Sequence, residues 1–126
     1  MILADHMKRL FIQQKPFSRM LDALIDTKKI SQKDYQDFEQ ALLENPKMGD
    51  VIPGLEGIRK TRLKGANKGK RGGFRVDYLD IPELEILHLI VIYAKNVKED
   101  LSSEEKKIIA SLARKLKEEA KNGKNV

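Results

Sequence analysis

The spacing of apolar residues changes twice along the chain, and this change limits the possible folds more than any other feature. Between Pro16 and Asn45 apolar residues recur every three or four positions, as they do on the buried face of a helix. From Ile58 to Tyr93 they alternate or form short runs, as in strands, and after Ser102 the helical spacing returns. Helices and strands kept apart along a chain of 126 residues are typical of a single α+β domain.

Seven elements are expected from these patterns, in the order strand, two helices, three strands and a last helix. The strands are expected at residues 8–14, 58–64, 74–79 and 85–93, and a loop is expected at residues 49–57. The links between the last three strands are short, which favours an antiparallel meander. Pro16 suits the first turn of the first helix, because its missing N–H costs nothing there. The other two helices begin with capping-box sequences, Ser31 with Asp34 and Ser102 with Glu105. The predicted fold is an antiparallel β-sheet with two N-terminal helices and one C-terminal helix.

Each predicted helix carries one apolar stripe that should face the core. The stripes are Phe17, Met20, Leu21, Leu24 and Ile25; Tyr35, Phe38 and Leu42; and Ile108, Ile109, Leu112, Ala113 and Leu116. Strand side chains alternate between two faces, so Val76 and Tyr78 should face the core. Arg75 and Asp77 should then face away from it. The same rule puts Tyr93 and Lys95 on the side of Leu89 and Val91.

Both ends of the chain are expected to lie outside the folded domain. Residues 1–6 are interpreted as an N-terminal extension without the pattern of a signal peptide, and Met7 is an alternative start. The domain is expected to span residues 7–122, with residues 123–126 as a tail. The longest apolar run, 86–94, is too short to cross a bilayer, and the lack of cysteine fits a reducing compartment. We therefore expect a cytoplasmic protein with no membrane partner.

Positive charge is concentrated in one part of the chain. The formal net charge is +6, and eight lysines and arginines lie from Arg59 to Arg75 with no acidic residue among them. A basic surface favours polyanionic partners, because binding releases the counterions of the polyanion. The charge distribution therefore indicates one location for contacts with a nucleic acid.

Strand alternation can place several of these cations on one face of the sheet. Lys60, Arg62 and Lys64 share a face of the first meander strand, and the neighbouring strand can add Arg75, with Lys95 at the rim. Such a cluster could bind a phosphate and stabilise the extra negative charge of a phosphorane transition state. The simpler alternative is a solvated basic strand beside a flexible lysine loop.

The glycine-rich loop at residues 65–73 adds Lys68, Lys70 and Arg71 as candidate RNA-binding residues. It is not a Walker loop, because Lys70 is followed by Arg71 instead of serine or threonine. Its glycines would let the backbone approach a phosphate chain closely, and an ordinary hairpin loop is the alternative. Tyr93, which lies near Lys95 in the sequence, could contact a base or equally well pack in the core.

The chain offers few groups for other kinds of catalysis. It has no cysteine and two histidines, of which His6 lies in the N-terminal extension. His88 lies inside an apolar strand, where a packed histidine is expected in place of a catalytic one. No spacing of histidine and cysteine suggests a transition-metal site, so we expect no metal and no cofactor.

Four blocks of sequence, in a fixed order, carry a resemblance to a known family. They are residues 45–52 (NPKMGDVI), 54–60 (GLEGIRK), 69–76 (GKRGGFRV) and 92–96 (IYAKN), the last followed by 100–102 (DLS). This succession resembles the HigB branch of the RelE/ParE superfamily of toxins and covers about residues 8–116. The architecture that the resemblance implies is an antiparallel sheet with two helices before it and one after it.

The resemblance implies an mRNA endonuclease that cuts messages in the ribosomal A site without a metal, by attack of a ribose 2′-OH on the adjacent phosphate. It implies that Lys60 and Arg62 form the basic pair of the first meander strand, with Lys60 as the general-base candidate. Arg75 would clamp the scissile phosphate, and Lys95 would be a rim cation. The implied partners are mRNA on the ribosome and a cognate antitoxin, expected to be of the helix-turn-helix type.

The chain departs from the best-studied RelE toxins at several positions. Asn96 stands where they carry a further arginine, and their tyrosine of the last segment is missing, so the acid for the leaving group is unassigned. Asp77 lies on the expected site face and could orient Arg75 or weaken RNA binding. Two other functions stay open. One is a ParE-like toxin that poisons DNA gyrase, which the cation cluster disfavours, and the other is a non-catalytic module that binds RNA or the ribosome.

Overall fold

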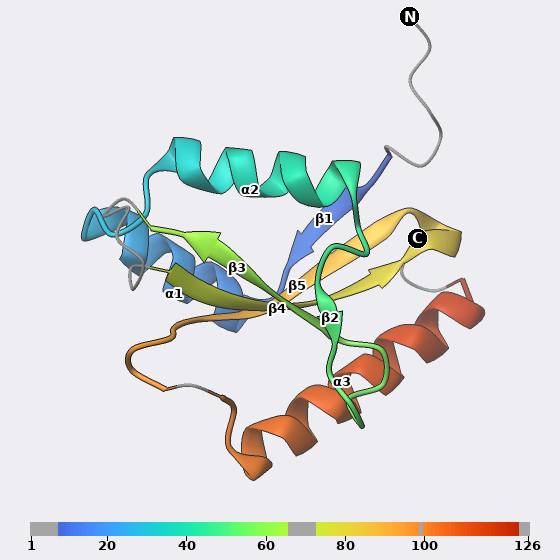
Figure 1. The fold of residues 1–126 in the computed structure, drawn as a ribbon. Helices are drawn as coiled ribbons and strands as arrows, with labels where there is room; N and C mark the ends of the chain where they lie inside the picture. Colours follow the sequence, from blue (N-terminus) through green and yellow to red (C-terminus); the bar gives the residue numbers. More distant parts are fainter. Residues whose placement is uncertain (1–7, 66–72, 99, 124–126) are drawn as a thin grey trace, which may run out of the picture.

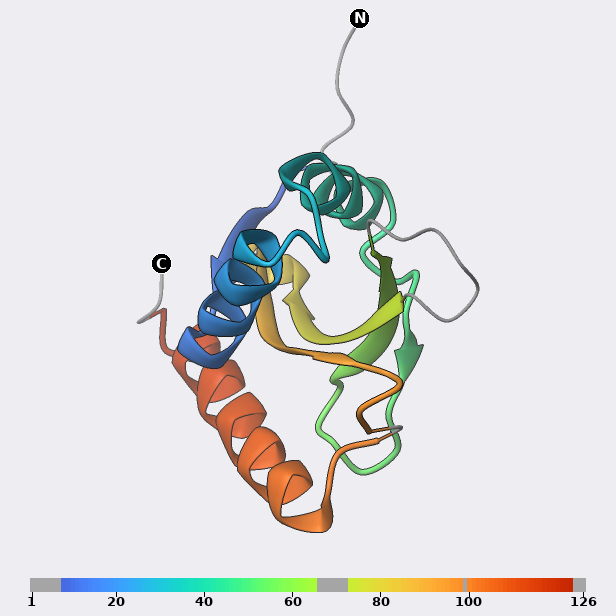
Figure 2. The ribbon, with the colours of Figure 1, turned by 90° about the vertical axis from the view of Figure 1, so that its left-hand side faces the viewer.

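A five-stranded mixed sheet forms the centre of the described structure, with α1 and α2 on one face and α3 on the other (Figures 1 and 2). The computed structural model describes residues 8–65, 73–98 and 100–123. In chain order the elements are β1 (Leu10–Gln13), α1 (Lys15–Asp26), α2 (Gln32–Glu44), β2 (Asp50–Val51), β3 (Arg59–Lys64), β4 (Gly73–Ile81), the 3-10 helix η2 (Pro82–Leu84), β5 (Ile86–Ala94) and α3 (Ser103–Lys121). The α+β class and the predicted order are confirmed, and β2 is an additional strand inside a segment predicted as a loop.

The meander predicted for the last three long strands is confirmed, but the sheet is not purely antiparallel. β3 pairs with β4, and β4 with β5, in antiparallel register. β1 runs parallel to β5, with Leu10 opposite Ile86. A parallel pair requires a long crossover, and here the whole chain from α1 to β4 lies between the two strands. The strand order across the sheet is therefore β1-β5-β4-β3-β2, with β1 at one edge.

The two faces of the sheet bury two separate apolar cores. On the face covered by α1 and α2, here named the helix-pair face, the core includes Phe17, Leu42, Val76, Tyr78 and Leu89. On the opposite side, named the α3 face, it includes Leu79, Ile90, Ile109, Ala113 and Leu116. β4 and β5 are therefore covered on both faces, and they position everything that projects from the sheet. None of the described helices is both long and apolar enough to cross a bilayer.

The helices begin as the sequence predicts, but their buried faces differ slightly. Ser31 and Ser102 each form the predicted capping box. Met20 and Ile108 were expected in the core, yet they are 43% and 68% exposed. Both lie at the margin of their apolar stripe. In α3 the small side chain of Ala110 is buried instead, because it allows the helix to pack closely on the sheet.

A β-bulge in β5 changes which residues face the helix pair. Asp77 pairs with Val91 and Tyr78 with Leu89, so Ile90 is an extra residue between two paired positions. Before the bulge Leu89 lies in the helix-pair core, and beyond it Tyr93 lies in the α3 core. The prediction that Tyr93 and Lys95 share a face with Leu89 is therefore wrong, because it assumed unbroken alternation.

The buried side chain of Tyr78 ties the loop after α2 to the middle of the sheet. Its hydroxyl donates a hydrogen bond to the carbonyl of Pro46 (2.8 Å) and accepts one from the N–H of Gly49 (3.0 Å). Arg59 donates to the carbonyl of Gly49 at 2.7 Å. A Cβ at position 49 would lie 2.6 Å from the carbonyl oxygen of Lys60, so only glycine permits this close approach. These contacts hold β2 beside β3.

Candidate active site

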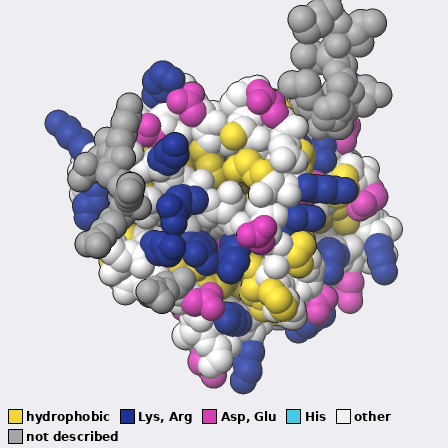
Figure 3. All heavy atoms as spheres, in the orientation of Figure 1, with side chains coloured by type: hydrophobic (Ala, Val, Ile, Leu, Met, Phe, Trp, Pro, Cys, Tyr) yellow, Lys and Arg dark blue, Asp and Glu magenta, His cyan; other side chains and the backbone are white. Residues whose placement is uncertain are grey.

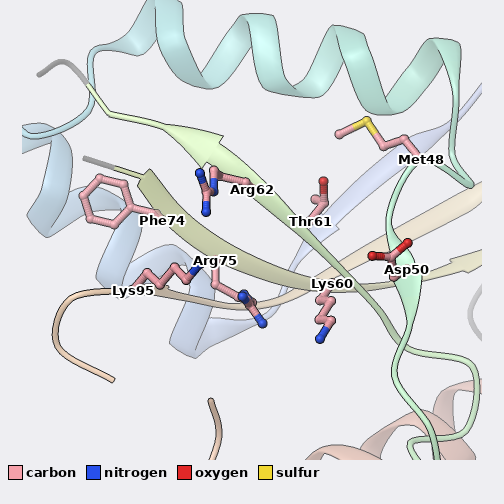
Figure 4. Close-up of a pocket in the computed structure, with 8 residues that line it drawn as sticks. All are labelled: Met48, Asp50, Lys60, Thr61, Arg62, Phe74, Arg75 and Lys95. Carbon is pink, nitrogen blue, oxygen red and sulfur yellow. The ribbon is translucent and has the colours of Figure 1, made fainter. Parts of the chain in front are cut away.

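The four cations predicted to be catalytic line one open pocket of about 200 Å³. Lys60 and Arg62 come from β3, Arg75 from β4, and Lys95 from the turn that follows β5 (Figure 4). In Figure 4 the charged ends follow one another in the order Arg62, Lys95, Arg75 and Lys60, so that the end of Arg75 lies between those of the two lysines. The remaining lining residues are Met48, Asp50, Thr61 and Phe74.

The sheet register explains why these cations meet. Arg62 lies directly opposite Arg75, and Arg75 lies directly opposite Tyr93. Directly opposed residues of antiparallel strands share a face, so the cations of β3 and β4 project together from the α3 face. Gly73 provides room for this arrangement, because a Cβ there would lie 2.9 Å from Cδ of Arg62. Arg62 can therefore lie across the neighbouring strand.

The pocket is positively charged and poorly neutralised. Among the described residues, none of the four cations forms an ion pair, whereas Lys98 pairs with Glu105 at 2.6 Å and Lys106 with Asp100 at 3.0 Å. A group of lysine and arginine side chains is visible on this side of the molecule in Figure 3. Four cations against the single lining carboxylate of Asp50 leave an excess of positive charge, which attracts an anion to the pocket. The arrangement is suited to bind a phosphate.

Asp77 lies on the same face as Lys60 and Arg75, but it does not face solvent. The predicted face is correct, but the side chain is not open to solvent there, because Asp77 is fully buried. Neither of its carboxylate oxygens has a hydrogen-bond partner among the residues that the structure describes. Burial raises the pKa of Asp77 to about 6, and the positive charges of Arg75 and Lys60 oppose this shift. An ionisable group therefore lies beneath the cations.

The predicted RNA-binding residues are only partly placed. Lys64 is exposed at the end of β3, on the face of Lys60 and Arg62. Tyr93 is 6% exposed and packs in the α3 core, with Nζ of Lys98 5.1 Å from its ring centroid. The structure therefore favours the core alternative for Tyr93, since its ring is not open to a base. Lys68, Lys70 and Arg71 lie outside the described residues, as do the extension 1–6 and residues 124–126 of the tail.

His88 has the packed position expected for it. It is 2% exposed on β5, and its Nδ1 lies 3.3 Å from Nε2 of Gln14. Burial lowers its pKa, so the neutral imidazole is favoured. Within the described ranges no group of three or more His, Asp or Glu side chains could hold a metal ion.

Asp50 is the lining residue of most chemical interest that the sequence patterns missed. It lies directly opposite Lys60 in the short β2–β3 pair, at an exposed position. A strand of two residues is too short to show any periodicity. The only signal that could have pointed to Asp50 is that it lies, with Gly49, shortly before the basic strand in the sequence. Lys60 thus lies between Asp50 on one neighbouring strand and Asp77 on the other.

Known protein families and structures give an independent view of this architecture. No family model matches the sequence. The structure is similar to a solved structure of the E. coli toxin RelE, a double arginine-to-alanine mutant in the free state, with a TM-score of 0.52 and 16% sequence identity. The similarity covers 73% of this chain and 88% of the RelE chain. The chain has the RelE-like fold. On this RelE-like fold, three of the four pocket cations lie on β3 and the first half of β4, and Lys95 follows β5, whereas the apolar α3 core in β4 begins at Leu79.

Proposed function

We propose that this protein is the toxin of a toxin–antitoxin pair and that it cleaves mRNA on the ribosome. The observation that carries the proposal is the convergence of Lys60, Arg62, Arg75 and Lys95 in one pocket. Two further observations support it, namely the fold shared with the toxin RelE and the sequence blocks that resemble HigB toxins. The cation pocket favours a toxin that acts on RNA over a gyrase poison.

In the proposed reaction a ribose 2′-oxygen attacks the adjacent phosphorus, and the bond to the 5′-oxygen of the next nucleotide breaks. The product carries a 2′,3′-cyclic phosphate. Arg62 and Arg75, opposite each other in the sheet, are placed to contact the phosphate oxygens as negative charge builds up on them. Lys60, as the uncharged amine, is the candidate to accept the 2′-OH proton, and the departing 5′-oxygen takes up a proton from water. Four cations around an open pocket do not align the attack alone, so we expect the ribosome to supply the alignment.

A message with a single 2′-deoxy nucleotide 5′ of the scissile phosphate should resist cleavage at that bond, because the nucleophile is missing. The 3′ ends of ribosome-bound messages, mapped after addition of the purified protein, measure this directly. The matched all-ribose message should be cut there, also after EDTA treatment under conditions that keep the ribosomes intact. Free mRNA should be cut poorly. Cleavage of the deoxy-substituted bond at the ribose rate would rule out the proposed chemistry.

The same assay separates the two other functions. DNA breaks that depend on gyrase, without cleavage of mRNA, would identify a ParE-like toxin. Binding to ribosomes with neither cleavage nor DNA breaks would identify a non-catalytic module.

The toxin–antitoxin assignment requires a protein partner, and the cation pocket suggests its chemistry. A surface that attracts RNA phosphates also attracts an acidic segment of a protein. Co-expression of the product of the neighbouring gene should therefore give a stable complex and restore the growth of cells that produce this chain. Failure of that product both to co-purify and to relieve growth inhibition would contradict the pairing.

A further inference from the structure

The buried carboxylate of Asp77 lies beside the site, but it has no role in the proposed reaction. Asp77 is 0% exposed, and both of its oxygens lack hydrogen-bond partners among the described residues. It lies directly opposite Lys60 and two positions after Arg75, on the same face of the sheet. Two of the four pocket cations are therefore its immediate neighbours.

The charged and titratable groups around Asp77 come from every element that packs on it. Lys60 belongs to β3, Arg75 to β4 and Tyr93 to β5, while Lys98 and Asp100 belong to the segment before α3. From α3, Glu105 binds Lys98 at 2.6 Å, and from β2 Asp50 lies on the far side of Lys60. None of these described groups makes a hydrogen bond to the Asp77 carboxylate. The surrounding cations therefore stabilise the negative charge of Asp77 without hydrogen bonding to it. In return, the charge of Asp77 reduces the positive potential at Lys60 and Arg75.

We propose that Asp77 regulates the charge of the cation pocket, so that protonation of its carboxyl strengthens the binding of the RNA phosphate backbone by Lys60 and Arg75. The inference rests on the proposed function, because it assumes that phosphates bind at these cations. Asp77 is fully buried and does not touch the RNA, so it is a positioning residue that acts through its two neighbours.

The pH range of this effect follows from the neighbours. Burial raises the pKa of Asp77 to about 6, close to neutral pH. Lys106 lowers the pKa of Asp100, and Lys98 lowers that of Glu105, so both carboxylates keep their charge between about pH 5 and pH 8. The pKa of Tyr93 is raised to about 12, so the phenol stays neutral over the same range. As the pH falls through 6, Asp77 loses its charge and the net charge of the pocket rises by one.

The test compares the wild type with Asp77→Asn and with Asp100→Asn. Binding of a fluorescein-labelled oligodeoxynucleotide, which lacks the 2′-OH and is not cleaved, is measured by anisotropy at constant ionic strength. One unit charge a few ångströms below a phosphate is expected to change the affinity about tenfold. The wild type should therefore bind about tenfold more tightly at pH 5 than at pH 8, whereas Asp77→Asn should bind tightly at both values.

Asp100→Asn is the matched control, because it removes one negative charge near Lys60 that does not titrate in this range. It should raise the affinity at both pH values and keep the slope of the wild type. A pH slope in Asp77→Asn equal to that of the wild type would overturn the inference and leave the proposed function standing. Absence of binding by all three proteins at both pH values would overturn the anion site and the inference together.

A measurement on the wild type keeps the inference testable if Asp77→Asn fails to fold. By linkage, a ligand that binds tenfold more tightly to the protonated form raises the pKa of that group by about one unit. Titration of the Asp77 carboxyl by 13C NMR should therefore show a higher pKa with the oligodeoxynucleotide than without it. An unchanged pKa at saturating oligodeoxynucleotide would refute the coupling.

Discussion

Replacement of Arg75 by alanine is expected to reduce mRNA cleavage by at least about 100-fold and to abolish growth inhibition, while the protein stays folded. Arg75 lines the pocket together with Lys95 and lies directly opposite Arg62. Alanine removes the charge and the two-pronged donor that could hold a phosphate. Arg75 is half-buried and makes no ion pair with described residues, so the free energy of unfolding should change by about 1 kcal/mol or less.

A substitution at the adjacent residue, Val76, is expected to affect folding instead of cleavage. Val76 is fully buried in the helix-pair core, and Val76→Asp should unfold the protein because it places a charge among apolar side chains. Arg19→Ala, an exposed change in α1, should affect neither toxicity nor stability. Circular dichroism and induced expression at matched protein levels distinguish the three variants. Growth inhibition by Arg75→Ala as strong as that of the wild type would remove Arg75 from the site.

Replacement of Asp80 by alanine should lower the free energy of unfolding by about 3–5 kcal/mol. Asp80 accepts two hydrogen bonds from Arg9, from Nε at 2.7 Å and from Nη2 at 3.1 Å. The two side chains are only 7% and 9% exposed, so the loss of Asp80 removes the carboxylate that holds a largely buried guanidinium through two hydrogen bonds. Urea denaturation measures the loss directly.

Two further variants test whether the loss of stability in Asp80→Ala results from the burial of the Arg9–Asp80 pair. Asp37→Ala removes the partner of Lys33 in an exposed pair, with side chains 66% and 81% exposed, and should change stability by about 0.5 kcal/mol or less. A double variant, Arg9→Met with Asp80→Leu, should recover much of the loss, because it replaces both charged side chains with apolar ones. A loss below about 1 kcal/mol for Asp80→Ala would show that water or another group replaces the carboxylate.

The helices could be predicted well because their signals are local. Ser31 and Ser102 meet their capping partners three residues away, so no tertiary contact is needed to recognise the helix starts. The strands were also found, because their apolar residues alternate or form short runs. The features that were not predicted depend on contacts between distant parts of the chain. They are the parallel pairing of β1 with β5 and the two-residue strand β2.

The candidate site was predicted in part for the same reason. Lys60, Arg62 and Arg75 lie on strand segments without a bulge, so alternation assigned them to one face and the register brought them together. Alternation also gave the correct face for Asp77, but it contains no information on what covers that face. The burial of Asp77 depends on tertiary packing, and among the groups near enough to interact with its charge are Tyr93 and Lys98, which lie far from it in the sequence. The bulge at Ile90, which sets the face of Tyr93, has no signal in the local sequence.

The central place of β5 in the sheet has a consequence for the order of events during synthesis. β5 is the last strand to leave the ribosome, yet it lies between β1, the first strand, and β4. When Lys60 and Arg75 have been made but β5 has not, one edge of β4 lacks its pairing strand. At that stage β1 has no strand to pair with, because β5 is its neighbour in the sheet. Such non-local pairing delays folding until late in translation. A protein proposed to cleave mRNA on ribosomes would therefore remain inactive towards the message that encodes it until β5 has been made and has paired with β1 and β4.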